Sequence, residues 1–145
     1  MSISHIMTHR NKLVTTTADA SLASLRDVFA KARFQHVPVT DASNRLVGIV
    51  SVKDYFRELS PVMDSATDPA IGLFIRSRKV HQVMVTPVIT ITEQTTVKQA
   101  AALLLQHNIS CLPVVDEQKH LLGIVSWKDI LRAALSKPAP VNTAG

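Results

Sequence analysis

Two stretches of the sequence combine a serine with an aspartate three residues later, and in each a lysine precedes the aspartate. They read Gly48-Ile49-Val50-Ser51-Val52-Lys53-Asp54 and Gly123-Ile124-Val125-Ser126-Trp127-Lys128-Asp129. A helix N-terminus with free backbone amides and a serine hydroxyl binds phosphate, and an ionised carboxylate accepts hydrogen bonds from both hydroxyls of a ribose. The residue types and their spacing therefore suit a nucleotide site in each stretch.

Each of these residues also has a structural interpretation. Ser-x-x-Asp is a common capping motif, in which the serine caps a helix and the acid is stabilised near its N-terminus. Lys53 and Lys128 fit solvated lysines at a helix start as well as phosphate contacts. Trp127 stands where the first stretch has Val52, and we expect it to pack in the core or against a linker rather than to stack on a base.

The two stretches belong to a longer internal repeat, which supplies the elements that position them. A shift of 75 positions superposes residues 15–57 on 90–132 without a gap, and seven of the thirteen identical pairs fall within residues 46–54. Each copy contains a short β-prone run, an amphipathic helix, two apolar runs joined by a turn, and a final helix. We therefore predict the order β-α-β-β-α in each copy.

A unit of about 45 residues buries its own sheet poorly, so the two copies are expected to cover each other about a pseudo-twofold axis. The predicted fold class is α+β. The first repeat is expected over residues 3–59, a helical linker over 60–79, the second repeat over 80–136 and a mobile tail over 137–145. In the linker, Asp68 and Pro69 are expected to be the N-cap and the first-turn proline of a helix.

The basic composition of the chain does not by itself select a partner. The net charge is +5, but the basic residues are scattered, and their densest cluster is Arg76, Arg78 and Lys79. Six aromatic residues in 145 provide no stacking platform interleaved with basic residues, so nucleic-acid binding is disfavoured.

No run approaches the roughly 18 apolar residues of a membrane span, and residues 1–10 lack the apolar run of a signal peptide, so a cytoplasmic location is expected.

The sequence offers no catalytic constellation. The six histidines show no metal-ligand spacing with a cysteine or an acid, and the repeated serines and aspartates have no identifiable third member. The single cysteine, Cys111, cannot form an internal disulfide and is expected to be a small buried apolar residue. We therefore expect no enzymatic activity and no required cofactor or metal.

The repeated cluster and the segments before it resemble the CBS-domain family, whose paired form is called a Bateman module. The matching residues are Val37-Pro38-Val39-Thr40-Asp41 and Leu112-Pro113-Val114-Val115-Asp116, each followed by one Gly-x-x-Ser-x-x-Asp stretch. The resemblance covers residues 3–135. It implies a disc-shaped pseudo-dimer with two clefts between the repeats, either or both of which hold AMP, ADP, ATP or S-adenosylmethionine.

Carried over by position, the resemblance assigns roles to individual residues. Asp54 and Asp129 would hold ribose hydroxyls, and Ser51 and Ser126 would meet a phosphate. The residues that would border the base are Thr15, Thr90, Val37, Pro38, Leu112 and Pro113. Two positions before the proline, where family members often carry a basic group for phosphate, the first copy has His36 and the second has Cys111. His36 also fits a plain strand residue, and the difference predicts two sites of unequal affinity.

The function expected from these features is a regulatory adenosine-nucleotide-binding module that senses energy state or a metabolite. Because the repeats take up the chain, its unknown target is expected to act in trans or to belong to a longer protein, and a homodimer is expected from the resemblance. Two alternatives stay open. One is a structural dimerisation or interaction module with empty clefts, and the other is a nucleic-acid binder.

Overall fold

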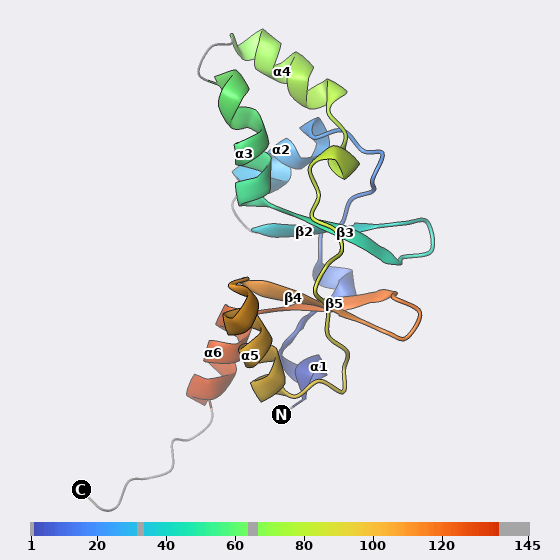
Figure 1. Cartoon of the computed structure of the whole chain (residues 1–145), viewed down its shortest axis with the longest axis vertical. Coiled ribbons are helices and arrows are strands. Elements are labelled where there is room, and N and C mark those ends of the chain that lie inside the picture. The colour runs from blue at the N-terminus through green and yellow to red at the C-terminus, as the bar shows by residue number, and fades with distance from the viewer. Residues whose placement is uncertain (1, 32–33, 64–66, 137–145) are drawn as a thin grey trace, which may run out of the picture.

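Two antiparallel β-hairpins lie in the middle of the molecule, with helices beyond each of them (Figure 1). The computed structural model describes residues 2–31, 34–63 and 67–136, and the predicted mobile tail, 137–145, lies outside the described residues. In the first hairpin, β2 (His36–Thr40) pairs with β3 (Leu46–Ser51), and in the second, β4 (Cys111–Val115) pairs with β5 (Leu121–Ser126). The two hairpins have equivalent registers, since His36 lies opposite Ser51 and Cys111 opposite Ser126.

The tips of the hairpins are joined by backbone hydrogen bonds. The amide of Leu46 donates to the carbonyl of Lys119 at 2.9 Å, and the amide of Leu121 donates to the carbonyl of Asn44 at 3.0 Å. Asn44 and Lys119 both have positive φ, at 65° and 71°, which places them in the left-handed region at equivalent turn positions. The reciprocal bonds relate the two copies by the predicted pseudo-twofold axis.

The first hairpin is covered by α2 (Ala23–Ala30), α3 (Val52–Met63) and α4 (Asp68–Ser77). α3 follows β3 directly, and the apolar face of α4 packs against α3 and α2. The aromatic rings of Phe29 and Tyr55, whose centroids are 5.2 Å apart, lie in the core that these helices enclose. The core residues are Leu22, Leu25, Phe29, Val37, Val39, Val50, Tyr55, Leu59, Ile75 and Val80.

The second hairpin is covered by α5 (Val97–His107), α6 (Trp127–Ser136) and the short N-terminal helix α1 (Ile3–Ile6). The short strand β1 (Thr8–His9) pairs with β5 and is followed by the 3-10 helix η1 (Arg10–Lys12). Thus residues 3–12, the lead-in before the first copy, pack with the second copy, where Ile3 and Met7 lie in the core. Conversely, Val80 in the 3-10 helix η2 (Val80–Gln82) packs in the first core, and Val85 bridges Ile49. This exchange ties the two copies together.

The predicted β-α-β-β-α order is confirmed, with differences in detail. The expected strands at 14–16 and 88–91 are each reduced to one parallel bridge, Thr16 to Val39 and Ile91 to Val114, because in each run a single residue exchanges backbone hydrogen bonds with the neighbouring strand. The linker helix is present, but its N-cap is Thr67, whose hydroxyl accepts from the amide of Ala70, so Asp68 is the first helical residue. Within the described ranges, no helix is long and apolar enough to span a bilayer.

Candidate functional site

Both Ser-x-x-Asp stretches form the reciprocal capping arrangement expected from their spacing. In the first copy, the amide of Asp54 donates to the Ser51 hydroxyl at 3.0 Å, and the amide of Ser51 donates to Oδ2 of Asp54 at 3.0 Å. In the second copy, the same two bonds join Ser126 and Asp129 at 3.2 and 2.8 Å. Both copies of the motif therefore form the helix cap that the structural interpretation predicts.

Capping leaves the Asp54 carboxylate with free acceptor capacity. An ionised carboxylate offers about four lone-pair sites. Besides the bond from Ser51, Asp54 receives a 3.3 Å contact at Oδ1 from the exposed guanidinium of Arg57. Its side chain is 14% exposed, so the remaining sites are available to a ligand in a mostly desolvated setting.

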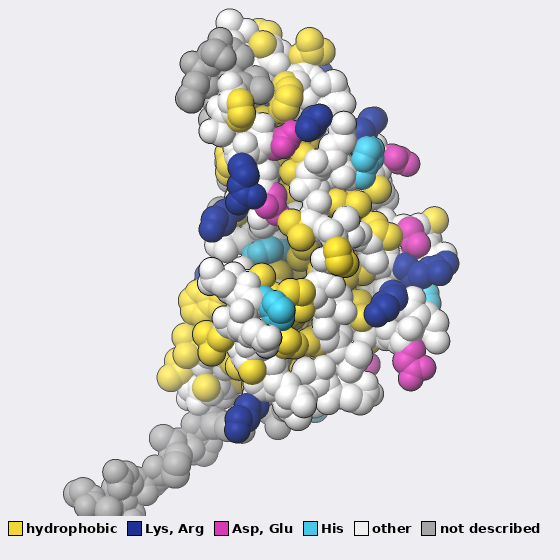
Figure 2. Space-filling view, viewed as in Figure 1, with side chains coloured by type: hydrophobic (Ala, Val, Ile, Leu, Met, Phe, Trp, Pro, Cys, Tyr) yellow, Lys and Arg dark blue, Asp and Glu magenta, His cyan; other side chains and the backbone are white. Residues whose placement is uncertain are grey.

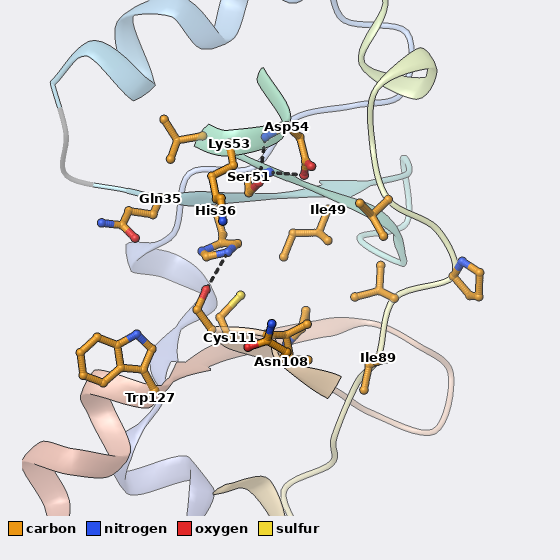
Figure 3. A pocket seen from close by; sticks show the side chains of 17 residues that line it. Gln35, His36, Ile49, Ser51, Lys53, Asp54, Ile89, Asn108, Cys111 and Trp127 are labelled. Carbon is orange, nitrogen blue, oxygen red and sulfur yellow. Dashed lines mark hydrogen bonds between the residues drawn. The ribbon is translucent and has the colours of Figure 1, made fainter. Parts of the chain in front are cut away.

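A cavity of about 600 Å³ opens between the two copies beside Asp54 (Figure 3). This volume lies within the range of roughly 300–1,000 Å³ that is typical of small-molecule sites. The first copy contributes the end of β3 and the start of α3, and the second copy contributes its lead-in and the segment between α5 and β4. The lining residues are Gln35, His36, Ile49, Ser51, Val52, Lys53, Asp54, Val85, Pro87, Val88, Ile89, Asn108, Ile109, Ser110, Cys111, Pro113 and Trp127.

The chemical character of the lining changes along the cavity. Figure 3 shows Ile89 toward one end, with Ile49 and Asp54 next along, Ser51 and His36 in the middle, and Gln35 and Trp127 toward the other end. The lining thus passes from aliphatic side chains through a carboxylate and a helix N-terminus to an aromatic ring. Figure 2 shows the same region as a hollow in the surface between the two halves of the molecule.

His36 crosses this region and links the two copies. Its Nε2 lies 3.2 Å from the Ser110 hydroxyl, which comes from the other repeat. Burial lowers the pKa of His36 below its ordinary value of 6.5, and the negative charge of Asp54 opposes this shift only in part. The imidazole is therefore mostly neutral at pH 7 and offers a hydrogen bond rather than a full positive charge.

Cys111 lines the cavity as an unreactive side chain. It is 8% exposed, and burial raises the pKa of its thiol to about 12. Because the thiolate is the nucleophile, a thiol with this pKa is inert near neutral pH. The expectation of a small buried residue is confirmed.

The cavity brings together part of the predicted site and leaves other members elsewhere. His36, Ser51, Lys53, Asp54 and Pro113 line it. The predicted partners from the second motif, Ser126, Lys128 and Asp129, are not among its lining residues, and neither are Thr15 and Thr90. The cavity therefore combines the helix start of one copy with the strand entry of the other, an arrangement that reading each copy separately does not reveal.

Val37, Pro38 and Leu112, which were predicted to border a base, are not among the residues that line the cavity. All three are fully buried, and Val37 and Leu112 belong to the hydrophobic cores of their copies. The segment that does face the cavity is the loop before β4, residues 108–110, where Asn108 has φ of 52° and ends α5. A left-handed asparagine at a helix end was the available signal for this turn.

Trp127 was expected to pack in the core or against a linker, and the placement in the core is wrong. The residue is 49% exposed and lines the cavity. It is the first residue of α6, where the helix start projects beyond the packed interior, and the Lys128 ammonium lies 5.9 Å from the centre of its ring.

In the part of the chain that the structure describes, no group of three or more His, Cys, Asp or Glu side chains could hold a metal ion.

The chain belongs to the CBS-domain family. The family matches residues 3–61 and 80–136, which together make up most of the sequence. This agrees with the paired copies, the exchanged lead-ins and the cavity between them. The family is one of regulatory modules, and the chain forms a CBS pair.

Solved CBS-pair structures share the whole architecture. CBSX2 from Arabidopsis thaliana, in complex with AMP, is 28% identical with a TM-score of 0.74, covering 92% of this chain and 96% of that chain. The CBS domain pair of protein MJ0100, in complex with 5′-methylthioadenosine and S-adenosyl-L-methionine, is 25% identical with a TM-score of 0.76, covering 95% and 98%.

Curated relatives match over a limited part of their length. The 5′-AMP-activated protein kinase subunit gamma-3 of Sus scrofa is 26% identical over 133 residues, which are 92% of this chain and 25% of the relative. The chain spans 24% and 21% of the length of two other curated relatives, both with enzyme names. The shared part is the CBS pair.

Proposed function

We propose that this CBS pair is a regulatory module that binds an adenine nucleotide or a related adenosine ligand in the cavity between its copies. The observation that carries the proposal is Asp54, a largely desolvated carboxylate with free acceptor sites, between an aliphatic end and a helix N-terminus. The AMP complex of CBSX2 and the S-adenosyl-L-methionine complex of MJ0100 support this class of ligand.

The order of side chains along the cavity suggests how the ligand lies. Ile49 and Ile89 would contact the base at the aliphatic end, and Asp54 would accept hydrogen bonds from the ribose hydroxyls. The phosphate would then reach the N-terminus of α3, with Ser51 and Lys53 nearby. His36 would donate a hydrogen bond there, and the phosphate charge would favour its protonated form.

The second motif would form the weaker site. Oδ2 of Asp129 accepts from both the amide and the hydroxyl of Ser126, at 2.8 and 3.0 Å, so less of its acceptor capacity is free. Thr15, which would border the base there, already accepts a hydrogen bond from Arg10 at 3.1 Å. A ligand at Ser126, Lys128 and Asp129 would have to displace these contacts.

A ligand in the cavity would touch both copies and thus favour one arrangement of the pair over others. A partner that contacts both copies would then bind the two arrangements with different affinities. We propose that the target is another protein or another part of a longer one, that the module acts without catalysis of its own, and that it works in the cytoplasm.

We also propose a homodimer. Phe56 on α3 and Leu131 on α6 occupy equivalent positions in the two copies and are 49% and 50% exposed. Figure 2 shows hydrophobic side chains gathered over the lower half of the molecule. Leu105 on α5 and Leu135 on α6 are exposed as well. A matched pair of apolar side chains on equivalent helices suits a symmetric contact with a second copy.

The alternative of a structural module with an empty cavity is favoured by one observation, the complete capping arrangement at both helix starts, which explains the motif without a ligand. Nucleic-acid binding has less support, because Arg78 from the basic cluster pairs with Glu58 at 2.6 Å.

Calorimetric titration with AMP, ADP, ATP and S-adenosylmethionine tests the proposal. We expect at least one ligand to bind below about millimolar concentration and, at 100 times its Kd, to stabilise the fold by roughly 2.7 kcal/mol. If none of the four ligands binds or shifts the melting temperature, the proposal is refuted and the alternative of a structural module with an empty cavity is favoured.

A further inference from the structure

Each copy is preceded by a lead-in, and the two lead-ins differ in length. In the first, Thr8 pairs with Ile124 of β5. In the second, Val85 bridges Ile49 of β3. Because the repeat superposes Ile49 on Ile124, Thr8 corresponds to Val85, 77 positions later. From Thr15 onward the repeat has a spacing of 75, so the first lead-in contains two additional residues.

The additional residues form the 3-10 turn η1, which begins at Arg10 and contacts β5. Figure 1 shows the first lead-in, in blue, behind the two hairpins and the second lead-in, in yellow, in front of them. Residues 85–89, at the corresponding place in front, form no helical turn, and four of them line the cavity beside Asp54. The chain is therefore bulkier at the back of the molecule, where the symmetry of the repeat would place a second cavity.

The side chain of Arg10 fixes η1 between the two hairpins. Its Nε donates to Oδ1 of Asn44 at 2.8 Å, and its Nη2 donates to the hydroxyl of Thr15 at 3.1 Å. The Nδ2 of Asn44 donates in turn to the carbonyl of Leu121 on β5 at 3.1 Å. The side-chain amide of Asn44 thus connects Arg10 to the second hairpin, and both of its ends are used.

The space beside η1 does not extend to the second Ser-x-x-Asp motif. The cavity beside Asp54 lies between the start of α3 and the second lead-in, so its counterpart would lie between the start of α6 and the first lead-in. A hollow of about 540 Å³ is present at η1, but neither Ser126 nor Asp129 lines it. Its lining residues are His9, Arg10, Asn11, Lys12 and Leu122.

The burial of equivalent isoleucines agrees with a closed second cleft. Ile49 is half-buried and lines the cavity, at the end proposed to contact the base. Its counterpart, Ile124, is buried, at 8% exposed. The aliphatic surface that the first cavity offers to a ligand is therefore covered in the second copy.

We propose that η1 is a plug, held in place by Arg10, that closes the second cleft, so that each chain binds a single nucleotide beside Asp54. This inference rests on the proposed function and determines its stoichiometry. The two motifs then have different tasks. Asp54 caps α3 and holds a ligand, whereas Asp129 only caps α6.

The two hydrogen bonds of Arg10 set the strength of the plug. A ligand that entered the second cleft would have to displace η1 and break both bonds. Because each bond has a charged donor, the two together correspond to a penalty of at least about a hundredfold in affinity. The second cleft should therefore stay empty at AMP concentrations that saturate the first.

Deletion of Arg10 and Asn11 gives the first lead-in the length of the second and tests the plug directly. Calorimetric titration with AMP should show one molecule bound per chain in the unmodified protein and two per chain in the deletion variant. Adding Asp129→Asn to the deletion should weaken the new site and leave the first unchanged. Two AMP molecules per unmodified chain, or one per chain after the deletion, would overturn the inference.

Arg10→Ala provides a second test in case the deletion variant does not fold. It keeps the length of η1 and removes only the two hydrogen bonds, so a second, weaker AMP site should become measurable. Lys12→Ala is the matched control, since it removes one exposed positive charge from the same turn and should still bind one AMP per chain. If Arg10→Ala also binds one AMP per chain, Arg10 does not close the cleft.

The outcomes also separate this inference from the proposed function. If AMP, ADP, ATP and S-adenosylmethionine all fail to bind the unmodified protein and both η1 variants, the proposed function itself is refuted. If AMP binds the unmodified protein beside Asp54 and neither η1 variant gains a second site, only the role of η1 is refuted.

Discussion

Replacing Asp54 with asparagine separates the two tasks that the structure assigns to this side chain. The asparagine has the same shape and keeps an oxygen that can accept the 3.0 Å hydrogen bond from the amide of Ser51. It removes the negative charge and one acceptor oxygen. The change therefore preserves most of the capping arrangement while altering the group that is proposed to hold the ribose.

The expected loss follows from the two ribose hydroxyls. A hydrogen bond to a charged group contributes about 1.5–3 kcal/mol and a neutral one about 0.5–1.5 kcal/mol, so each hydroxyl loses about 1 kcal/mol. The sum of about 2 kcal/mol corresponds to an increase in Kd of roughly thirtyfold. Loss of the negative charge from the first turn of α3 lowers the free energy of unfolding by about 1 kcal/mol or less.

The chain contains a matched control in Asp129→Asn. Asp129 caps α6 through the same two backbone bonds and is 13% exposed, compared with 14% for Asp54, but it does not line the cavity. Both variants should lose similar stability in thermal denaturation. In calorimetric titrations with AMP, only Asp54→Asn should weaken the tighter site.

A role for Asp54 in holding the ribose is refuted if the two variants change AMP affinity equally, or if Asp54→Asn binds AMP as the unmodified protein does. The first result would mean that affinity follows helix capping, and the second that the carboxylate does not touch the ribose.

Further predictions concern packing, reactivity and pH. Gly123→Ala should destabilise the fold by about 1–3 kcal/mol in chemical denaturation, and more than Gly48→Ala. The Cβ added at Gly123 meets the backbone oxygen of Thr8 at 2.5 Å, whereas the Cβ added at Gly48 meets the flexible side chain of Met84. Equal losses of stability in the two variants would contradict this. Cys111, with a thiol pKa of about 12, should resist alkylation at pH 8 in the folded protein and react fully in denaturant; rapid labelling of folded protein would show that the thiol is accessible. The lowered pKa of His36 means that the unfolded chain binds more protons below about pH 6.5, so its contribution to stability is present above that pH and is lost as the pH falls toward the folded pKa. His36→Gln should therefore show a smaller loss of stability than the unmodified protein between pH 7 and 5, and an identical loss would exclude His36 as the cause.

The repeat made most of the fold accessible from the sequence. A gapless shift of 75 residues with identities concentrated in residues 46–54 fixes equivalent strands and helices in both copies. The reciprocal helix cap was also predictable, because the hydrogen bonds between Ser51 and Asp54 depend only on their spacing in the sequence. The helix of the linker was found from Asp68 and Pro69, although its cap is Thr67.

What the sequence did not reveal depends on contacts between the copies. The lead-ins cross, so that Ile3 is buried with the second core and Val80 with the first, and no local pattern encodes this exchange. For the same reason, the cavity pairs Asp54 with the segment 108–111 of the other repeat. Trp127 was misplaced because its size predicts burial, whereas its place at a helix start leaves it beside the cavity.

A crystal structure of the protein grown with AMP would show whether the ligand occupies the cavity and meets Asp54. We expect AMP between the copies, with both ribose hydroxyls within hydrogen-bonding distance of Asp54 and the phosphate near Ser51 and the start of α3. An empty cavity at saturating AMP, or a nucleotide bound away from Asp54, would contradict it.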